Sequence, residues 1–194
     1  MFLTPIIIAA GYVGILGAVF METGFFLGFF LPGDSLLFTA GILAAGGYFN
    51  IVWLIVGAAV AAIAGDSLNY ATGRWFGQKF LTKERRFIKK EYIEKTNDYY
   101  AKYGKKTIVI SRFIPIVRTF APLLAGVSKM DYPSFITYNV LGGTVWAVGF
   151  LSVAYYLGNT FKGIQNYLTV IVILIVIVSI LPVLVDYFSK RKEK

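Results

Sequence analysis

Four ionisable side chains lie in apolar stretches of this chain. Glu22 and Asp34 flank one apolar run, and Arg112 and Arg118 bracket another. An ionised group at membrane depth costs at least ~2.5–3.5 kcal/mol, so it normally lines a transport path or a substrate site. Arginine holds phosphate through a planar pair of donors and keeps its proton, whereas a desolvated carboxylate can take a proton up. The two arginines therefore predict a phosphate-binding site, and the two acids predict proton carriers.

A fifth charged residue, Asp66, lies inside the next apolar segment. Tyr70 and Arg74 follow it within one or two turns of the expected helix. A local network of Asp66 with Tyr70 or Arg74 is therefore expected. We expect this group to support the site, with direct contact to substrate as the less favoured role.

The composition is that of an integral membrane protein. Of 194 residues, 57% are hydrophobic and only 15% are charged, which predicts a single all-α, polytopic membrane domain over residues 1–194. The net charge of +9 lies beside the expected crossings and at the C-terminal end, where it sets topology and meets anionic head groups. No nucleic-acid partner is expected.

The chain has no cysteine and no histidine. This removes disulfides, thiol chemistry, the usual general base and the commonest metal ligand. A lipid-phosphate enzyme would need an activated nucleophile or a cluster of acids around a metal, and neither is present in the sequence. We expect no enzymatic activity, no metal and no cofactor, apart from a proton gradient or a sodium gradient.

The first half, residues 1–78, is expected to contain a hairpin and a crossing. A helix cannot continue through the Pro-Gly-Asp element at 32–34, and arms of about 10–14 residues are too short to span. This predicts a re-entrant hairpin over about 20–47, followed by a full crossing from Ile51 to near Arg74. Whether residues 2–19 cross the membrane, lie on it or begin the hairpin is left open.

The connector, residues 79–106, has ten lysines and arginines against four acids, with apolar side chains at helical spacing. This pattern favours a basic amphipathic helix on the membrane surface. The alternative is a solvated linker whose charges only set the topology.

The second half, residues 107–158, repeats the pattern of the first. Pro115 and Pro122 are expected to break the apolar stretch 107–128 into a second re-entrant hairpin. A crossing from Ser134 to Leu157 is expected next. Pro133 suits the first turn of its helix.

The uniformly apolar stretch 167–188 predicts a last transmembrane helix, and residues 189–194 form a basic tail. Short segments rich in Lys and Arg remain cytoplasmic, so the tail and the connector are both predicted to lie inside. The first hairpin then opens outward and the second opens inward. Phe-Leu-Pro at 30–32 is echoed by Phe-Ile-Pro at 113–115, which indicates an inverted repeat.

Inverted-repeat transporters bind substrate near the midplane, where broken helices from the two halves meet. We therefore expect the hairpin tips to bring Glu22 and Asp34 near Arg112 and Arg118. The alternative is that these charges pair only to hold the hairpins together. Glycine and alanine clusters at 41–47, 58–65 and 142–143 are interpreted as helix-packing sites, and the tryptophans and tyrosines as interface anchors.

Three ordered elements resemble the DedA family, whose eukaryotic relatives share the VTT, or SNARE-associated, domain. They are Glu22 with the Phe-rich arm leading to 32–34, the stretch 65–74 (GDSLNYATGR), and 112–118 (RFIPIVR) leading to Ala-Gly at 125–126. Three elements in the right order are specific where one alone would be weak. The resemblance covers residues 11–158.

The resemblance implies a lipid translocase of the bacterial cytoplasmic (inner) membrane. It implies movement of undecaprenyl phosphate or phospholipid between leaflets, dependence on the proton-motive force, and a role in the cell envelope. The essential acids of the family match Glu22 and Asp34, and its essential arginines match Arg112 and Arg118. Relatives often carry Pro-Gly-Glu where this chain has Asp34, which shortens the side chain by one methylene.

The sequence therefore predicts a proton-coupled flippase whose partners are an anionic lipid and the bilayer, with formation of a homo-oligomer left open. A proton-coupled small-ion transporter is one alternative, because the same acids would serve a cation. A membrane scaffold or assembly factor is the other, although such a protein would not need four charges at membrane depth.

Overall fold

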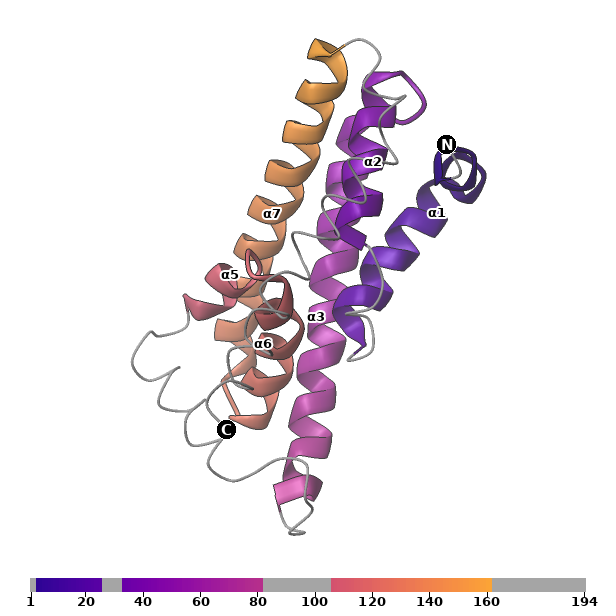
Figure 1. Ribbon diagram of the computed structural model, residues 1–194. Coiled ribbons are helices and arrows are strands. Elements are labelled where there is room, and N and C mark those ends of the chain that lie inside the picture. Colours follow the sequence, from indigo (N-terminus) through magenta and orange to yellow (C-terminus); the bar gives the residue numbers. More distant parts are fainter. Residues whose placement is uncertain (1–2, 26–32, 82–105, 162–194) are drawn as a thin grey trace, which may run out of the picture.

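The computed structural model describes residues 3–25, 33–81 and 106–161 (Figure 1). Every regular element in these ranges is a helix. The order is α1 (Leu3–Gly24), α2 (Gly33–Ala45), α3 (Ile51–Leu81), α5 (Thr107–Ser111), α6 (Pro115–Val127) and α7 (Tyr132–Thr160). The last predicted crossing at 167–188, the basic tail, and nearly all of the connector lie outside the described residues.

Helix α3 is the axis of the fold. It packs against α1, α6 and α7, while α2 packs mainly on α7. In Figure 1, α1 and α2 lie beside one end of α3, and α5 and α6 lie toward its other end. The largest apolar cluster is formed by α1, α2, α3 and α7, with Val19, Leu37, Ala58 and Leu151 all fully buried.

Both crossings expected within the described residues are present as helices. Ile51–Trp75 and Tyr132–Thr160 are long and apolar enough to span a membrane. Asn50 caps the first, because its Oδ1 accepts from the Val52 N–H (2.9 Å) and from the Trp53 N–H (3.3 Å). Asp131 caps the second by accepting from the Ser134 N–H at 3.0 Å. Proline in the first turn of α7 is also confirmed.

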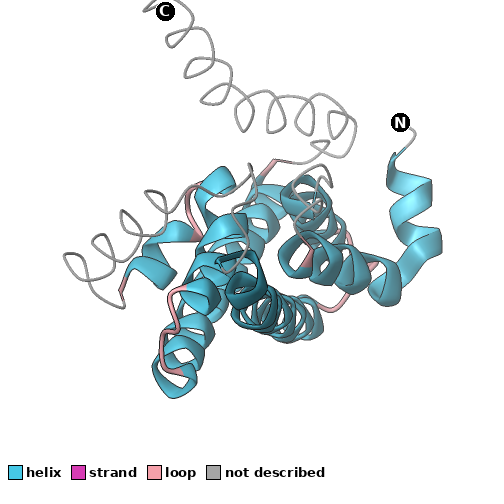
Figure 2. Cartoon of the chain, turned by 90° about the horizontal axis from the view of Figure 1, so that it is seen from below, coloured by secondary structure: helices cyan, strands magenta, loops and turns pink. Residues whose placement is uncertain are grey.

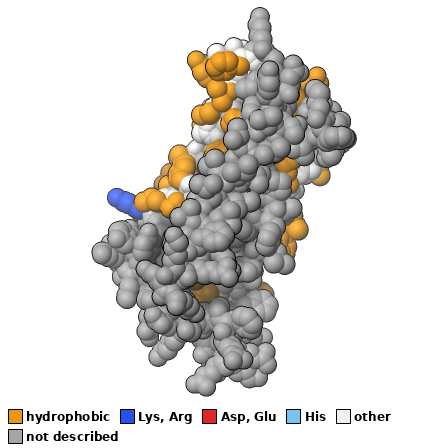
Figure 3. Space-filling view, viewed as in Figure 1, with side chains coloured by type: hydrophobic (Ala, Val, Ile, Leu, Met, Phe, Trp, Pro, Cys, Tyr) orange, Lys and Arg blue, Asp and Glu red, His pale blue; other side chains and the backbone are white. Residues whose placement is uncertain are grey.

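The surface of these helices is apolar. Trp53, Val56, Val145 and Val153 are among the large hydrophobic side chains that point outward, and hydrophobic side chains dominate the described part of the face in Figure 3. Outward-facing valine and tryptophan on helices of spanning length suit a lipid environment.

The helix breaks occur near the predicted positions. Helix α1 ends at Gly24 and α2 begins at Gly33, while α6 begins at Pro115. The expected break at Pro122 is wrong, because this residue lies inside α6. Proline removes one N–H from the helix ladder, and the 13-residue helix continues through that single loss.

Helix α1 extends over the stretch that the sequence left open. Gly11 has a positive φ of 58° inside it, a conformation that glycine adopts without a steric penalty. Figure 2 shows the N-terminal end of the chain lying apart from the other helices. Helices α2 and α6 have 13 residues each, or about 20 Å, which is less than the ~30 Å hydrocarbon core of a bilayer.

Glycines bring three helices into backbone contact. A side chain at Gly73 of α3 would collide with the Leu123 carbonyl of α6, and one at Gly126 of α6 would collide with the Tyr70 carbonyl of α3. Gly65 of α3 meets α1 in the same way. The prediction that small residues allow close packing is confirmed at Gly65 and at Gly41, where a Cβ would collide with Ala154 of α7. Gly73 and Gly126 are further contacts of this kind, outside the clusters that the sequence indicated.

Replacing Gly126 with Ala should lower the thermal stability of the purified protein. The added Cβ would overlap the α3 backbone, and overpacking of this kind costs about 1–3 kcal/mol. Gly17→Ala is the matched control, because a Cβ there meets no atom within 4 Å. Thermal unfolding in detergent measures both variants, and equal melting temperatures would contradict the described α3–α6 contact.

Candidate functional site

Arg118 lies in the first turns of α6 and holds two carboxylates. Its Nη2 donates to Glu22 Oε1 at the end of α1, and its Nη1 donates to Asp34 Oδ1 at the start of α2, at 2.6 Å. All three side chains are largely buried, with exposed fractions of 9%, 8% and 16% for Arg118, Glu22 and Asp34. One guanidinium therefore joins the two helix breaks, as the sequence predicted for these residues.

Backbone and aromatic groups complete this cluster. The Gly33 N–H, at the N-terminus of α2, also donates to Glu22. A Cβ at Gly33 would collide with the Glu22 carboxylate, so a larger residue here would displace that carboxylate from its present position. Trp146 of α7 lies over the Arg118 guanidinium at 5.5 Å from its ring centre, a cation–π contact. Helix α2, through Gly33, and helix α7, through Trp146, therefore both stabilise the ion pairs.

Arg112 forms a separate cluster at the end of α5. Its Nη2 donates to Asp66 Oδ2 of α3 and to Asn139 Oδ1 of α7. Asn139 Nδ2 in turn donates to the Ile63 carbonyl at 3.1 Å. The Arg112 and Asp66 side chains are each 5% exposed. The neutral Arg112–Asp66 pair and Asn139 therefore connect the break between α5 and α6 to α3 and α7, the two helices of membrane-spanning length.

Two adjacent glycines provide the space for Arg112. The guanidinium and the side-chain Cδ lie against Gly142 and Gly143 of α7. Among the described residues, no hydrogen-bond partner is found for the buried Arg112 Nε. The Gly-Gly pair, interpreted from sequence as a helix-packing site, therefore accommodates a charged side chain as well.

The four charged side chains were expected to lie together, but they belong to two separate clusters. Glu22 and Asp34 contact Arg118, whereas Arg112 contacts Asp66. The predicted network of Asp66 with Tyr70 or Arg74 is not formed. The Tyr70 hydroxyl donates to the Met130 carbonyl and accepts from Arg74 Nη1 at 3.0 Å.

The Tyr70–Arg74 contacts have a structural role. They connect α3 to the joint between α6 and α7, because Arg74 Nη1 also donates to the Met130 carbonyl at 3.3 Å. The Tyr70 ring stacks on Phe135, with ring centres 4.4 Å apart. These two residues support the helices around the site and do not contact its charges.

The two clusters together contain one more acid than base. Two arginines, Arg112 and Arg118, face three carboxylates, Glu22, Asp34 and Asp66. A buried unbalanced charge is costly, so the surplus negative charge needs compensation. Because Asp66 is matched one to one, the surplus acid belongs to the Arg118 cluster.

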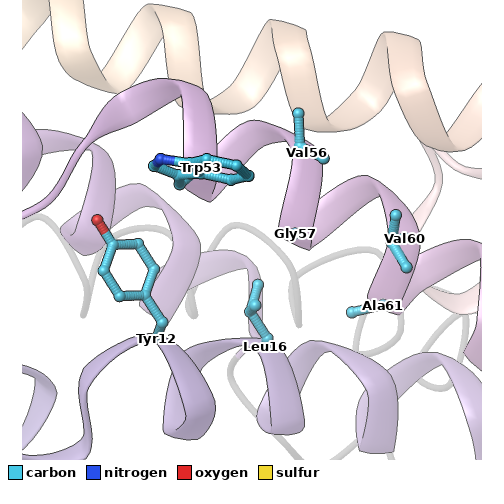
Figure 4. A pocket seen from close by; sticks show the side chains of 7 residues that line it. All are labelled: Tyr12, Leu16, Trp53, Val56, Gly57, Val60 and Ala61. Carbon is cyan, nitrogen blue, oxygen red and sulfur yellow. The ribbon is translucent and has the colours of Figure 1, made fainter.

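An apolar groove runs between α1 and α3 (Figure 4). It is largely open to the surface, has a volume of about 630 Å³, and is lined by Tyr12, Leu16, Trp53, Val56, Gly57, Val60 and Ala61. The only hydroxyl in the lining, that of Tyr12, accepts from the Asn50 N–H at 2.7 Å. The groove can hold hydrocarbon, and it contains none of the charged residues described above.

Sequence reasoning missed three uncharged buried residues around the two clusters. They are Asn139 beside Arg112, Trp146 over Arg118, and Asn69 of α3, whose amide donates to the Thr23 and Thr119 carbonyls. Asn139 and Asn69 are buried amides in apolar helices, a signal that differs from a buried charge only in degree. Trp146 was interpreted as an interface anchor, but its side chain is 2% exposed and covers Arg118. Buried polar residues in spanning helices would have indicated Asn69 and Asn139.

The sequence is similar to those of known proteins over most of its length. The model of the VTT domain matches residues 31–156. Protein DedA of Escherichia coli (strain K12) is 41% identical over 177 residues, covering 90% of this chain and 80% of that protein. An uncharacterized membrane protein of Mycobacterium tuberculosis is 42% identical over 89% of this chain and 77% of its own length. The inner membrane protein YqjA of E. coli (strain K12) is 32% identical over 80% and 71%. No solved structure matches.

Arg112→Gln should destabilise the protein by roughly 3–5 kcal/mol, because it leaves the Asp66 charge buried without its partner. The double variant Asp66→Asn with Arg112→Gln should recover most of that loss, since no uncompensated charge remains. Thermal unfolding of the wild type, both single variants and the double variant measures the coupling. A double variant no more stable than Arg112→Gln alone would contradict a neutral structural pair.

Proposed function

Because the chain belongs to the DedA family of VTT-domain membrane proteins, we propose that it moves an anionic lipid between the two leaflets of a membrane. The lipid is undecaprenyl phosphate or a phospholipid. Arg118 binds its phosphate, and Glu22 and Asp34 carry protons that couple the movement to the proton gradient.

The observation that carries the proposal is the sharing of Arg118 by two acids. The Glu22 carboxylate accepts from a guanidinium and from the N–H of Gly33 at the N-terminus of α2. Guanidinium groups and helix N-termini are the donors that bind phosphate in proteins. The Glu22 carboxylate therefore accepts from the kinds of donor that would bind a phosphate at the same position.

A coupled cycle follows from this exchange. When the lipid phosphate binds Arg118, Glu22 loses its cation and remains in an apolar setting, which favours uptake of a proton. When the phosphate leaves, the carboxylate returns to Arg118 and the proton is released. Asp34 keeps one guanidinium nitrogen occupied throughout, or exchanges in the same way.

Arg112 receives a positioning role in this scheme. Asp66 and Asn139 both accept from its Nη2, and the pair is neutral. We assign it the task of holding the α5–α6 break so that Arg118 projects toward α1 and α2. This separates the two arginines that the sequence analysis grouped as phosphate ligands.

The short helices suit re-entrant hairpins. The part of α1 after Gly11 with α2, and α5 with α6, would enter from opposite sides as an inverted repeat and meet at Arg118. The connector and the tail would then lie on the cytoplasmic side of the inner membrane. This arrangement needs neither a catalytic residue nor a cofactor other than the ion gradient.

A lipid is favoured over a small ion by the groove between α1 and α3. Its volume of about 630 Å³ and its apolar lining are within the range of small-molecule sites and suit a hydrocarbon chain. Trp53 and Val56, which line it, point outward, so the groove is open to lipid from the bilayer.

In proteoliposomes with an imposed pH gradient, the wild type should move labelled undecaprenyl phosphate faster than empty vesicles do. Arg118→Ala should abolish this movement, because the phosphate loses its donors. Glu22→Gln should remove the response to the gradient, because the amide carries no exchangeable charge. Lys106→Ala, an exposed residue outside both clusters, is the control and should behave as wild type.

Two outcomes would oppose the proposal. Full transport by Arg118→Ala would exclude this residue as the anion site. A folded wild type that moves no lipid above background would favour a small-ion transporter, tested by ion flux in the same vesicles, or a scaffold.

A further inference from the structure

Asn69 joins the two helices that carry the shared ion pair. It lies in α3, is 2% exposed, and uses one amide nitrogen for two contacts. Its Nδ2 donates to the Thr23 carbonyl of α1 at 3.3 Å and to the Thr119 carbonyl of α6 at 2.8 Å. Thr23 directly follows Glu22, and Thr119 directly follows Arg118. Both amide hydrogens are therefore used next to the two partners of one ion pair.

The neighbouring glycines explain how one short side chain reaches both helices. Gly65, Asn69 and Gly73 follow one another at intervals of four residues along α3, so they lie on one slowly turning face. Gly65 lies against the backbone of α1, and Gly73 lies against the backbone of α6. Asn69 is midway between the two crossings, where α1 and α6 are both within reach.

One acceptor carbonyl lies at the end of its helix. Thr23 is in the last turn of α1, which ends at Gly24, and carbonyls there lack partners within the helix. The Asn69 amide can therefore serve the Thr23 carbonyl without competing with a helical hydrogen bond. In α6, Pro122 has no N–H to donate to the Arg118 carbonyl four residues earlier, and the Thr119 carbonyl that accepts from Asn69 is the next one along the helix.

We propose that Asn69 is a positioning residue that sets the separation of Glu22 and Arg118 by holding the backbone immediately after each of them. Its role in geometry is independent of the proposed function. Its role in transport rests on that function. In the proposed cycle, Glu22 and Arg118 separate and pair again while Asn69 holds the backbone beside each of them.

The chain has no cysteine, so spin labels can be introduced at chosen pairs without removing native thiols. Met21 and Val117 are neighbours of Glu22 and Arg118 and are 45% and 39% exposed. Labels at Met21→Cys and Val117→Cys report the α1–α6 separation. A second pair, Val56→Cys and Val148→Cys, reports α3–α7 and serves as the reference.

Asn69→Leu keeps a similar volume and removes both donors. The distance distribution of the Met21–Val117 pair should broaden and shift to longer values, while the Val56–Val148 pair stays unchanged. Ser67→Ala is the matched control, because the Ser67 hydroxyl donates only within α3, to the Ile63 carbonyl at 2.8 Å. Asn69→Gln, which keeps the donors, should restore part of the narrow distribution.

An unchanged Met21–Val117 distribution in folded Asn69→Leu would overturn the proposal, and so would equal changes in both label pairs. If the leucine variant does not fold, Asn69→Ser, which is smaller and keeps one donor, should broaden the same pair to a lesser degree. In vesicles, Asn69→Leu should lose gradient-driven lipid movement. If the distances respond but the wild type moves no lipid, the proposed function fails and the positioning role stands.

Discussion

The structure depends on one guanidinium group that satisfies two carboxylates in an apolar protein. Arg118 draws the end of α1, the start of α2 and the start of α6 to one point. None of these charges could remain buried alone, because an unpaired ion in such surroundings is strongly destabilising. The glycine contacts of α3 with α1 and α6 are the means by which the three helix ends approach closely enough for the pairing to form.

The two arginines differ in what surrounds them. Arg112 is matched by Asp66, supported by Asn139 and enclosed against two glycines of α7. Arg118 is shared by two acids, one of which also takes a backbone N–H at a helix start. The first arrangement is neutral, although the Arg112 Nε has no partner among the described residues, whereas the second has a surplus acid, which under the proposed function an anion would displace. A static anchor next to an exchangeable pair is consistent with a transporter site.

The parts of this arrangement that local chemistry controls were predictable from sequence. Proline and glycine determine where helices end, so the breaks at Gly33 and Pro115 and both described crossings followed from the residue pattern. The cost of buried charge made pairing of Glu22, Asp34 and Arg118 predictable without any distance. Pro122 was misjudged because a helix tolerates the loss of one N–H when tertiary contacts hold it.

The remaining features depend on partners far away in the chain. Asp66 contacts Arg112 across 46 positions, whereas the local pattern indicated Tyr70 and Arg74 one or two turns away. Asn69, Asn139 and Trp146 acquire their roles only through contacts with other helices. The sequence could mark the two amides as polar residues in apolar helices, but it could not show which distant groups they contact.

The most direct measurement of the central claim is the distance between a lipid phosphorus and the Arg118 nitrogens. Protein with ¹⁵N-labelled arginine side chains, reconstituted with undecaprenyl phosphate, would be studied by ³¹P–¹⁵N dipolar dephasing in the solid state. We expect dephasing that shows direct contact in the wild type and disappears in Arg118→Lys, whose ammonium nitrogen is not labelled. Dephasing that persists unchanged in Arg118→Lys, or none in the wild type with lipid bound, would contradict Arg118 as the anion site.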